Sequence, residues 1–392
     1  MHNINRRTFL YTGALLCCNS IPDFGSILFS DGCAEASVTD IRGTVFKRDA
    51  PETIWKWSCE GRYYTNILGD KTVCLLCPNK CVLSPGDRSV CRVRVNVKGK
   101  LYSLVYGNPC AVNVDPIEKK PLYHFKPGTP AFSIATTGCS FRCLNCQNWE
   151  ISQAKPHEVR YMEMFPEQVV QNALRAKAVS IAYTYSEATV FYEYMMDTAK
   201  LAKDSGLSNL WISNGYINPE PLAALCGVLG AANVNLKAFS DEIYRKLNGG
   251  TLEPVLNTFK TLHEHKVHFE ITNLVVPGYT DDDEMVKKMC GWILSTLGPD
   301  YPLHFSRFAP KYKLDRLPPT PVSTLTRFRN LAMKEGIRYV YVGNIPDHEG
   351  NHTYCHGCGK RLIERKGFFI NRDGLDGDQC RYCKTRIPGV WI

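Results

Sequence analysis

The chain lacks several features that would assign it to a class at once. It has no run of eighteen or more apolar residues, so the sequence predicts no membrane-spanning helix. It has no solenoid-type repeat and no low-complexity tract, which excludes a stacked-repeat architecture. It has no long basic run either, because the net charge of +9 comes from 47 basic and 38 acidic residues spread along the chain. Such a mild excess is typical of a solvated surface, and the sequence carries no strong signal for a nucleic-acid partner.

Cysteine, by contrast, is abundant, with eighteen residues in a chain of 392. A chain of this length can bury large cores in two or three domains, so it does not need the disulfide framework of a small secreted domain. Most of the cysteines fall into three short-interval clusters, and such clusters more often hold metal than form disulfides. The clusters are Cys74, Cys77, Cys81 and Cys91; Cys139, Cys143 and Cys146; and Cys355, Cys358, Cys380 and Cys383.

The first residues resemble an export signal. The stretch from Asn5 to Leu10 carries an arginine pair in a twin-arginine-like context, and a short apolar run follows from Tyr11 to Cys18. We therefore expect residues 1-40 to be a twin-arginine-like signal and linker, cleaved near Ala34 to Ala36, with export to the periplasm or membrane surface. The alternatives are a lipid-attachment site at Leu15 to Cys18, or a cytoplasmic location with a chance arginine pair.

The rest of the chain divides into three regions. Residues 50-125 are rich in cysteine and contain short β-like runs, with a turn at Asn96 to Gly99. Residues 126-345 alternate strand-like and helix-like segments, and residues 350-392 form a small module with two cysteine pairs. The strands expected in the middle region are 131–135, 179–185, 210–213, 234–239, 268–276, 303–308 and 339–342. The expected helices are 166–176, 189–204, 219–229, 252–265, 282–297 and 321–334.

This alternation predicts an α/β fold with a parallel sheet and right-handed crossovers. Six or seven such units favour a partial (β/α)6-type barrel, with a doubly wound open sheet as the alternative. Both architectures place active-site groups at the carboxyl ends of the strands.

The central cluster, Cys139, Cys143 and Cys146, follows the first strand of the expected barrel directly. Four thiolates would complete a [4Fe–4S] cluster, whereas three leave one iron open to bind a substrate or cosubstrate. Gly138 allows the backbone to approach the cluster closely. The spacing therefore predicts a [4Fe–4S] cluster with a vacant iron at the mouth of the barrel; three buried or zinc-binding thiols are the alternative.

The segment from Thr137 to Cys146 resembles the signature of the radical S-adenosylmethionine (radical SAM) superfamily, apart from Asn145, where an aromatic residue is common. The resemblance implies that SAM chelates the open iron. One electron then cleaves SAM to methionine and a 5′-deoxyadenosyl radical, which abstracts hydrogen from a substrate. Further segments resemble the AmmeMemoRadiSam-system radical SAM enzymes, relatives of the pyruvate formate-lyase activating enzymes. These segments are Asp115 to Phe125, Cys146 to Gln153 and Tyr183 to Glu187.

That resemblance implies site residues at several strand ends. Ser186, Glu187 and Asn214 are expected to contact SAM, while Lys237, Asn273 and Arg307 are expected to contact substrate, with Lys237 and Arg307 as catalytic residues. Each has a structural alternative: a helix cap for Glu187, a turn for Asn214, a solvated lysine for Lys237 and a structural ion pair for Arg307. Asn235 replaces an acid that the family pattern would place two residues before Lys237.

The two flanking clusters each offer four thiols. Cys74, Cys77, Cys81 and Cys91 suit a structural zinc ion or a coordinatively full iron–sulfur cluster, and the sequence slightly favours zinc. Cys355, Cys358, Cys380 and Cys383 have the spacing of a zinc ribbon, with a rubredoxin-like iron site as the alternative.

We expect a radical SAM oxidoreductase that receives electrons from a low-potential flavodoxin or ferredoxin-like donor. The family resemblance further implies AMMECR-domain and Memo-like pathway partners. One alternative function is activation of a glycyl-radical enzyme. Two others belong to different classes: a zinc-binding interaction or nucleic-acid-binding protein, and an exported electron carrier.

Overall fold

The computed structural model describes residues 46–47, 50–51, 56–367 and 369–391. The expected signal, together with Cys17, Cys18 and Cys33, lies outside the described residues. Within the described part of the chain, no helix is both long and apolar enough to cross a membrane.

An eight-stranded sheet forms the centre of the described chain, in the order β16-β15-β14-β13-β12-β11-β10-β9. All neighbours from β10 to β16 pair in parallel, whereas β9 pairs antiparallel with β10. This partial barrel confirms the α/β fold predicted from the alternating pattern. Its strands are β9 (Ala111–Pro116), β10 (Pro130–Ala135), β11 (Ser180–Tyr183), β12 (Ser208–Ser213), β13 (Ala231–Asn235), β14 (His268–Val275), β15 (Leu303–Arg307) and β16 (Val340–Gly343).

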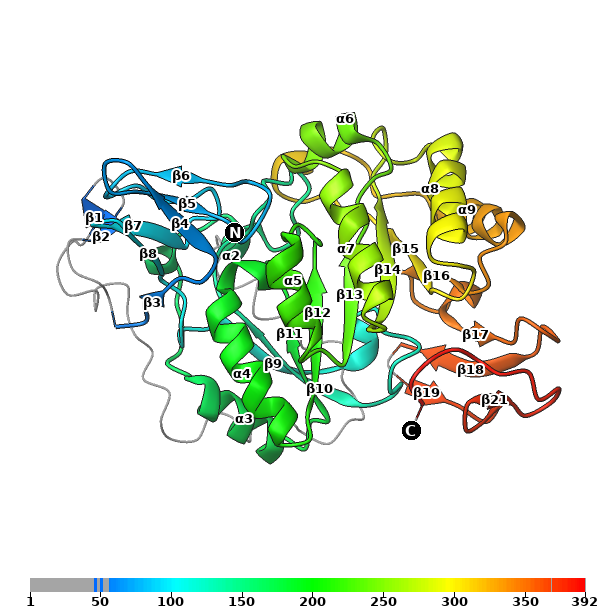
Figure 1. The fold of residues 1–392 in the computed structure, drawn as a ribbon. Helices are drawn as coiled ribbons and strands as arrows, with labels where there is room; N and C mark the ends of the chain where they lie inside the picture. The colour runs from blue at the N-terminus through cyan, green and yellow to red at the C-terminus, as the bar shows by residue number, and fades with distance from the viewer. Residues whose placement is uncertain (1–45, 48–49, 52–55, 368, 392) are drawn as a thin grey trace, which may run out of the picture. The chain divides into compact units, whose positions relative to one another are not determined.

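Helices connect the parallel strands, and Figure 1 shows α4, α5 and α7 in front of strands β11 to β14. Local chemistry fixes their ends: Asp282 Oδ1 accepts the N–H of Met285 at 2.6 Å, and acids fill the first turn of α8. The α-helices are α2 (Trp149–Ser152), α3 (Pro166–Arg175), α4 (Tyr192–Asp204), α5 (Pro219–Cys226), α6 (Asp241–Ile243), α7 (Glu253–Glu264), α8 (Asp283–Thr296) and α9 (Val322–Glu335). The short helical turns are η2 (Ile117–Lys119), η3 (Pro156–Glu158), η4 (Ala188–Phe191), the π-helix η5 (Tyr244–Asn248), η6 (Tyr312–Leu314) and η7 (Glu349–Asn351).

Strand β9 was not expected from the sequence. It lies within the region assigned to the cysteine-rich domain, yet it pairs with β10 along its whole length, from Pro116 opposite Pro130 to Ala111 opposite Ala135. Its valines, Val112 and Val114, pack against the main core, whereas Asn113 and Asp115, which alternate with them, are polar. A strand with one polar face inside a barrel gives only a weak hydrophobic signal, which explains why it was missed.

The segment 117–125, which we call the plug, fills the amino end of the barrel. Ile117, Leu122 and Phe125 form a cluster with small residues near the start of the parallel strands, among them Ala131 and Ala231. The amide of Asn233 on β13 donates to the carbonyl of Pro121 at 2.8 Å. The barrel interior is therefore closed by side chains at its amino end, which leaves the carboxyl end for chemistry.

The cysteine-rich region packs against the barrel through small antiparallel sheets. Its key contact is a buried ion pair, in which Arg94 on β7 donates to both carboxylate oxygens of Glu193 on α4 at 2.6 and 2.7 Å. The backbone N–H of Arg62 reaches the same carboxylate at 2.7 Å. The strands are β1 (Phe46–Lys47), β2 (Ala50–Pro51), β3 (Cys59–Glu60), β4 (Tyr64–Ile67), β5 (Lys71–Cys74), β6 (Val82–Leu83), β7 (Arg94–Val97) and β8 (Lys100–Ser103).

The C-terminal module joins the barrel through a chain of hydrogen bonds. Arg365 Nη1 donates to Thr353 Oγ1 at 2.8 Å, Thr353 contacts the Tyr341 hydroxyl at 2.9 Å, and Tyr341 contacts His124 Nε2 at 2.6 Å. His124 Nδ1 lies 2.6 Å from the carbonyl of Pro388, which can only accept. His124 is thus protonated on Nδ1 and accepts from Tyr341 on Nε2. The module's strands are β17 (Thr353–Tyr354), β18 (Arg361–Lys366), β19 (Phe369–Asn371), β20 (Leu375–Asp376) and β21 (Gln379–Cys380).

Candidate active site

Cys139, Cys143 and Cys146 lie on the loop that leaves the carboxyl end of β10. Cys143 is buried, and the other two are partly exposed. Burial, with a contribution from nearby Glu187, raises the pKa of the Cys139 thiol well above its usual value. An isolated thiolate is therefore unfavourable here, and a bound metal cluster would supply the missing positive charge.

Amide groups surround the three thiols. The N–H of Phe141 donates to Cys139 Sγ at 3.4 Å, and the side-chain amide of Asn214 approaches the same sulfur at 3.7 Å. The amide of Asn248 donates to Cys143 Sγ at 3.2 Å. Hydrogen bonds of this kind tune the potential of protein-bound clusters, because they stabilise the more negative, reduced state.

The segment Tyr244 to Gly250 wraps the cysteine loop and was missed in the sequence. The backbone N–H groups of Arg142 and Leu144 donate to the carbonyls of Asn248 and Leu247 at 2.8 and 2.9 Å. A Cβ at Gly250 would collide with the ring of Phe141, so the glycine permits the close approach. The only sequence signal was a pair of glycines after an asparagine, which reads as an ordinary turn.

Glu187 is fully engaged by the protein. It caps η4 through the N–H of Thr189 at 2.9 Å, and it accepts from Ser213 Oγ at 2.6 Å and from the N–H of Asn214 at 2.8 Å. The predicted helix-cap alternative is therefore present. Glu187 ties the ends of β11 and β12 together and holds Asn214, whose amide in turn donates to Ser140 Oγ at 3.0 Å.

Ser186 and Lys237 remain available for a bound cosubstrate or substrate. The Oγ of Ser186 is buried and has no hydrogen-bond partner among the described residues. Lys237 lies close enough to Cys146 to lower the pKa of that thiol, although burial and Cys143 raise it overall. The expected strand 234–239 ends earlier, since β13 stops at Asn235 and the N–H of Lys237 donates to the Tyr244 hydroxyl instead.

Two predicted substrate contacts are placed elsewhere. His304 and Ser306 of β15 share one face of the strand, and Arg307 belongs to the opposite face with Phe305, which packs on Phe328 of α9. Its Nε donates to the carbonyl of Thr320 at 2.9 Å. Arg307 is therefore held in a structural contact rather than aimed into the barrel.

Asn273 shows the same pattern on β14. It shares a face with Phe269, which packs on Phe259 of α7, and its amide donates to the carbonyl of Leu236 at 2.8 Å. This placement supports a role in positioning the loop that carries Lys237, and the buried Oδ1 of Asn273 has no hydrogen-bond partner among the described residues.

A charged cluster of Asp115, Lys119 and Lys120 lies near the amino end of the barrel, where Asp115 pairs with Ala131 at the start of β10, and the side chain of Tyr185 reaches it from the loop after β11. Buried Asp115 accepts from Lys120 at 2.5 Å, from Lys119 at 2.8 Å and from the Tyr185 hydroxyl. Lys120 also lies 4.5 Å from the centre of the Tyr185 ring. Burial alone would raise the pKa of Asp115, but the two lysines and Tyr185 lower it overall, so the carboxylate is charged. In the sequence, Asp115, Lys119 and Lys120 belong to the family motif from Asp115 to Phe125, and no role was predicted for them.

The four C-terminal cysteines form a compact group. Their sulfur atoms all lie within 4.8 Å of one another, and Cys355 lies 3.6 Å from Cys383 while Cys358 lies 3.7 Å from Cys380. The hydroxyl and N–H of Thr385 lower the pKa of Cys383 to about 6. Thiolates at this spacing can hold a single metal ion.

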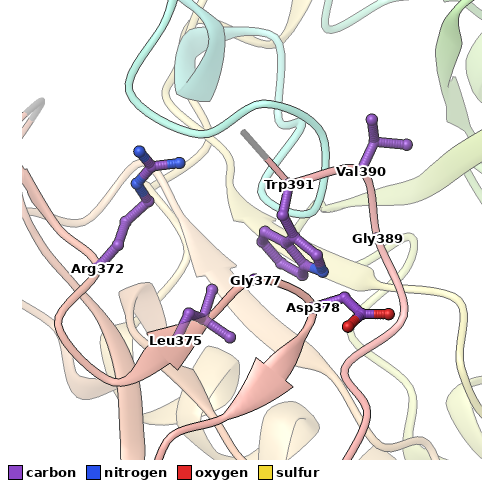
Figure 2. A pocket seen from close by; sticks show the side chains of 7 residues that line it. All are labelled: Arg372, Leu375, Gly377, Asp378, Gly389, Val390 and Trp391. Carbon is purple, nitrogen blue, oxygen red and sulfur yellow. The ribbon is translucent and has the colours of Figure 1, made fainter.

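A surface pocket of about 490 Å³ is lined by residues 372–391 of this module (Figure 2). Figure 2 shows Trp391 at its centre, with Leu375 and Asp378 beside it. The pocket contains none of the predicted site residues. The candidate active site is therefore the region around Cys139, Cys143 and Cys146.

A partial parallel barrel with three thiols on the loop after its first parallel strand defines a radical SAM protein. The family model described as "Radical SAM superfamily" matches residues 133–290. The chain belongs to the radical SAM superfamily and is a radical SAM enzyme.

Among its relatives is an uncharacterized protein of Methanocaldococcus jannaschii, 46% identical over 334 residues, which cover 84% of this chain and 99% of the relative. Pyruvate formate-lyase 1-activating enzyme of Escherichia coli K12 is 25% identical over 221 residues, covering 52% of this chain and 89% of that enzyme.

Two solved structures are also similar to the chain. A domain of a Bacteroides vulgatus pyruvate-formate lyase-activating enzyme is 12% identical with a TM-score of 0.38, covering 42% of this chain and 99% of that one. A radical SAM methyltransferase from Sphaerobacter thermophilus is 14% identical with a TM-score of 0.45, covering 56% and 67%.

Proposed function

We propose that Cys139, Cys143 and Cys146 hold a [4Fe–4S] cluster on which the enzyme cleaves SAM in order to abstract hydrogen from a substrate. The observation that carries this proposal is the set of three thiols on one loop, two of which accept hydrogen bonds from side-chain amides. When bound, the cluster supplies the electron that breaks the SAM sulfonium bond.

The chain's own residues hold and shield this site. Asn214 and Asn248 orient the thiols, and Glu187 fixes Asn214 through its backbone N–H. The unpartnered hydroxyl of Ser186 is the protein group best placed to bind a polar atom of SAM. The plug closes the amino end of the barrel, so substrate and SAM enter from the carboxyl end.

The substrate is proposed to lie at the carboxyl end of the barrel, between Lys237 and the loop that carries Tyr185 and Ser186. Tyr185 belongs to the loop after β11, next to Ser186, and its hydroxyl accepts from the amide of exposed Asn113 at 3.2 Å. Lys237 beside this space favours a substrate that carries negative charge.

We also propose that the four C-terminal cysteines bind a structural zinc ion. Its role is to fold the module whose Arg365 and Thr353 hold the plug. We further propose a low-potential flavodoxin or ferredoxin-like donor, AMMECR-domain and Memo-like pathway partners, and export by the twin-arginine route with a cytoplasmic location as the alternative.

A second candidate function is activation of a glycyl-radical enzyme, favoured by the similarity to pyruvate formate-lyase 1-activating enzyme. Anaerobic incubation with pyruvate formate-lyase, SAM and a reductant distinguishes the two. A glycyl-radical signal in electron paramagnetic resonance (EPR) spectra would support the second candidate.

The test of the main proposal is anaerobic reconstitution with iron and sulfide, followed by SAM and dithionite. We expect 5′-deoxyadenosine from the wild-type protein and only the background level from Cys143→Ala, because the cluster loses a ligand. Cys226→Ala is the matched control, since Cys226 is a buried thiol on α5 far from the cysteine loop in the sequence. Product formation by Cys143→Ala at the wild-type rate would overturn the ligand assignment.

A further inference from the structure

We propose that Cys74, Cys77, Cys81 and Cys91 hold a second iron–sulfur cluster that passes electrons to the first. The sequence slightly favoured zinc for these cysteines. The proposal rests on the proposed cluster at Cys139, Cys143 and Cys146, and its argument comes from contacts between the two cysteine loops.

The two loops touch directly. The side-chain amide of Asn79, which lies between Cys77 and Cys81, donates to the carbonyl of Ser140 at 2.8 Å. On the other side, a Cβ at Gly138 would lie 2.6 Å from the carbonyl oxygen of Cys91. Gly138 has φ +98°, a conformation that favours glycine, so the backbone before Cys139 packs against the ligand loop without an intervening side chain. The two cysteine loops are therefore in direct contact.

The spacing of the four thiols suits a cluster better than a single ion. The N–H of Cys74 donates to the carbonyl of Cys81 at 2.9 Å, and the N–H of Val90, next to Cys91, donates to Cys81 Sγ at 3.5 Å, so these contacts bring the cysteine segments together. Among the described residues, however, the group whose sulfurs all lie within 4.8 Å of one another is the C-terminal one. A zinc ion with sulfur ligands at about 2.3 Å requires that compact arrangement, whereas an iron–sulfur cube holds its thiolates farther apart.

The surroundings are those of a redox centre. Cys74 and Cys91 are buried beside Leu76 and Val93, and this apolar shell excludes water from that side. The N–H of Val90 donates to Cys81 Sγ at 3.5 Å, and Ser89 Oγ lies 3.0 Å from Cys91 Sγ. Cys81 is partly exposed and Lys80 is exposed, so the opposite side is open to a donor protein.

The electron balance is simple. A low-potential flavodoxin or ferredoxin-like protein gives one electron to the N-terminal cluster and is itself oxidised by one electron. That electron passes to the first cluster and then to SAM, whose sulfonium C–S bond breaks to give methionine and a 5′-deoxyadenosyl radical. The N-terminal cluster returns to its oxidised form and is ready for the next electron.

The first test is the metal content and Mössbauer spectrum of the anaerobically purified wild-type protein, which needs no variant to fold. Two [4Fe–4S] clusters give about eight irons and eight sulfides per chain, with zinc confined to the C-terminal site. A second zinc ion per chain, with about four irons, would overturn the proposal and leave the first cluster intact.

Variants then assign the irons to sites. Cys77→Ala is expected to lose about four irons and to keep the EPR change that SAM causes at the first cluster, whereas Cys143→Ala loses the other four. Cys358→Ala is the matched control, which should lose zinc and keep all the iron. An unchanged iron content in Cys77→Ala would contradict the second cluster. The proposed function is tested separately, because the EPR change caused by SAM should be lost in Cys143→Ala and kept in Cys77→Ala.

Electron transfer is tested by stopped-flow reduction of the first cluster with a reduced flavodoxin. We expect reduction to slow at least about tenfold in Cys77→Ala, and reduction at the wild-type rate in this variant would rule out the relay.

Discussion

At the scale of single residues, the site is defined by the groups that donate to sulfur. Asn214 follows strand β12 and Asn248 ends the π-helix η5, yet each directs an amide at a thiol of the same loop. Asn248 is fully buried, and its Oδ1 has no hydrogen-bond partner among the described residues. The hydrogen bond from its Nδ2 to Cys143 Sγ is thus the side-chain hydrogen bond that the structure gives for Asn248.

Replacing Asn248 with alanine should lower the reduction potential of the first cluster. The variant loses a hydrogen bond that stabilises the reduced state, and one hydrogen bond to a charged group is worth about 1.5–3 kcal/mol. An EPR-monitored redox titration measures the shift. Asn235→Ala is the control, because the amide of Asn235 donates to the carbonyl of Ser213 rather than to a thiol. Equal potentials for wild type and Asn248→Ala would show that this contact does not tune the cluster.

At the scale of elements, two glycines show how the same substitution has opposite effects. Gly250 follows the π-helix η5 and allows the ring of buried Phe141 to pack against the backbone. Gly291 is exposed within α8, and nothing lies within 4 Å of the position that its Cβ would take. Gly250 is needed for the close packing of Phe141 at the site, whereas Gly291 makes no such contact and only lowers the stability of helix α8.

Gly250→Ala should therefore lower the free energy of unfolding by about 1–3 kcal/mol, because overpacking displaces Phe141. The displacement should also reduce the iron bound per chain, since Phe141 lies between two of the cluster ligands. Gly291→Ala should raise the free energy of unfolding by up to about 1 kcal/mol and leave the iron content unchanged. Denaturant unfolding and iron analysis check both; full iron loading of Gly250→Ala would show that the loop tolerates the methyl group.

At the scale of the whole molecule, the buried polar chain between the plug and the C-terminal module makes the fold sensitive to acid. Burial lowers the pKa of His124 to about 4. Nearby, burial alone would raise the pKa of Glu270, but hydrogen bonds from His268 and His304 lower it well below its usual value. Glu270 also accepts the N–H of His124 at 2.6 Å, so both groups belong to one interface.

Both pKa shifts predict that the folded protein becomes less stable as the pH is lowered. The folded protein keeps His124 neutral, whereas the unfolded chain binds a proton below its usual pKa of 6.5. The shift to about 4 therefore removes about 3 kcal/mol of stability as the pH falls through that window. Glu270 adds a further loss below its usual pKa of 4.5, because the unfolded chain binds a proton there while the fold keeps this carboxylate charged.

Thermal unfolding between pH 7 and pH 4.5 measures this dependence. His124→Asn, which keeps a polar side chain and does not titrate, should be less stable at pH 7 and should show a smaller loss between pH 6.5 and 4.5. An equally steep loss in this variant would assign the acid sensitivity to other groups.

The sequence by itself determined the fold class and the central thiols. Strands and helices from β10 to α9 follow a hydrophobic alternation that is local in the chain, and the three-cysteine spacing is local as well. Both therefore appear in a single pass along the sequence, and both agree with the structure. The helix ends agree within a few residues, since caps such as Asp282 are also local signals.

Only the tertiary structure decided which distant groups meet. Several features depend on segments that only folding brings together, and none of them has a sequence pattern of its own. They are strand β9, the plug, the position of Asn248, and the contact of Asn79 with Ser140. The tertiary structure also decided which way Arg307 and Asn273 face, and both belong to the outer face of the barrel. The ends of an apolar run do not define the register of a strand, and this register decides which of its residues face inward. Local sequence spacing thus identifies the three central cysteines as ligands, whereas packing between remote segments determines which residues surround them.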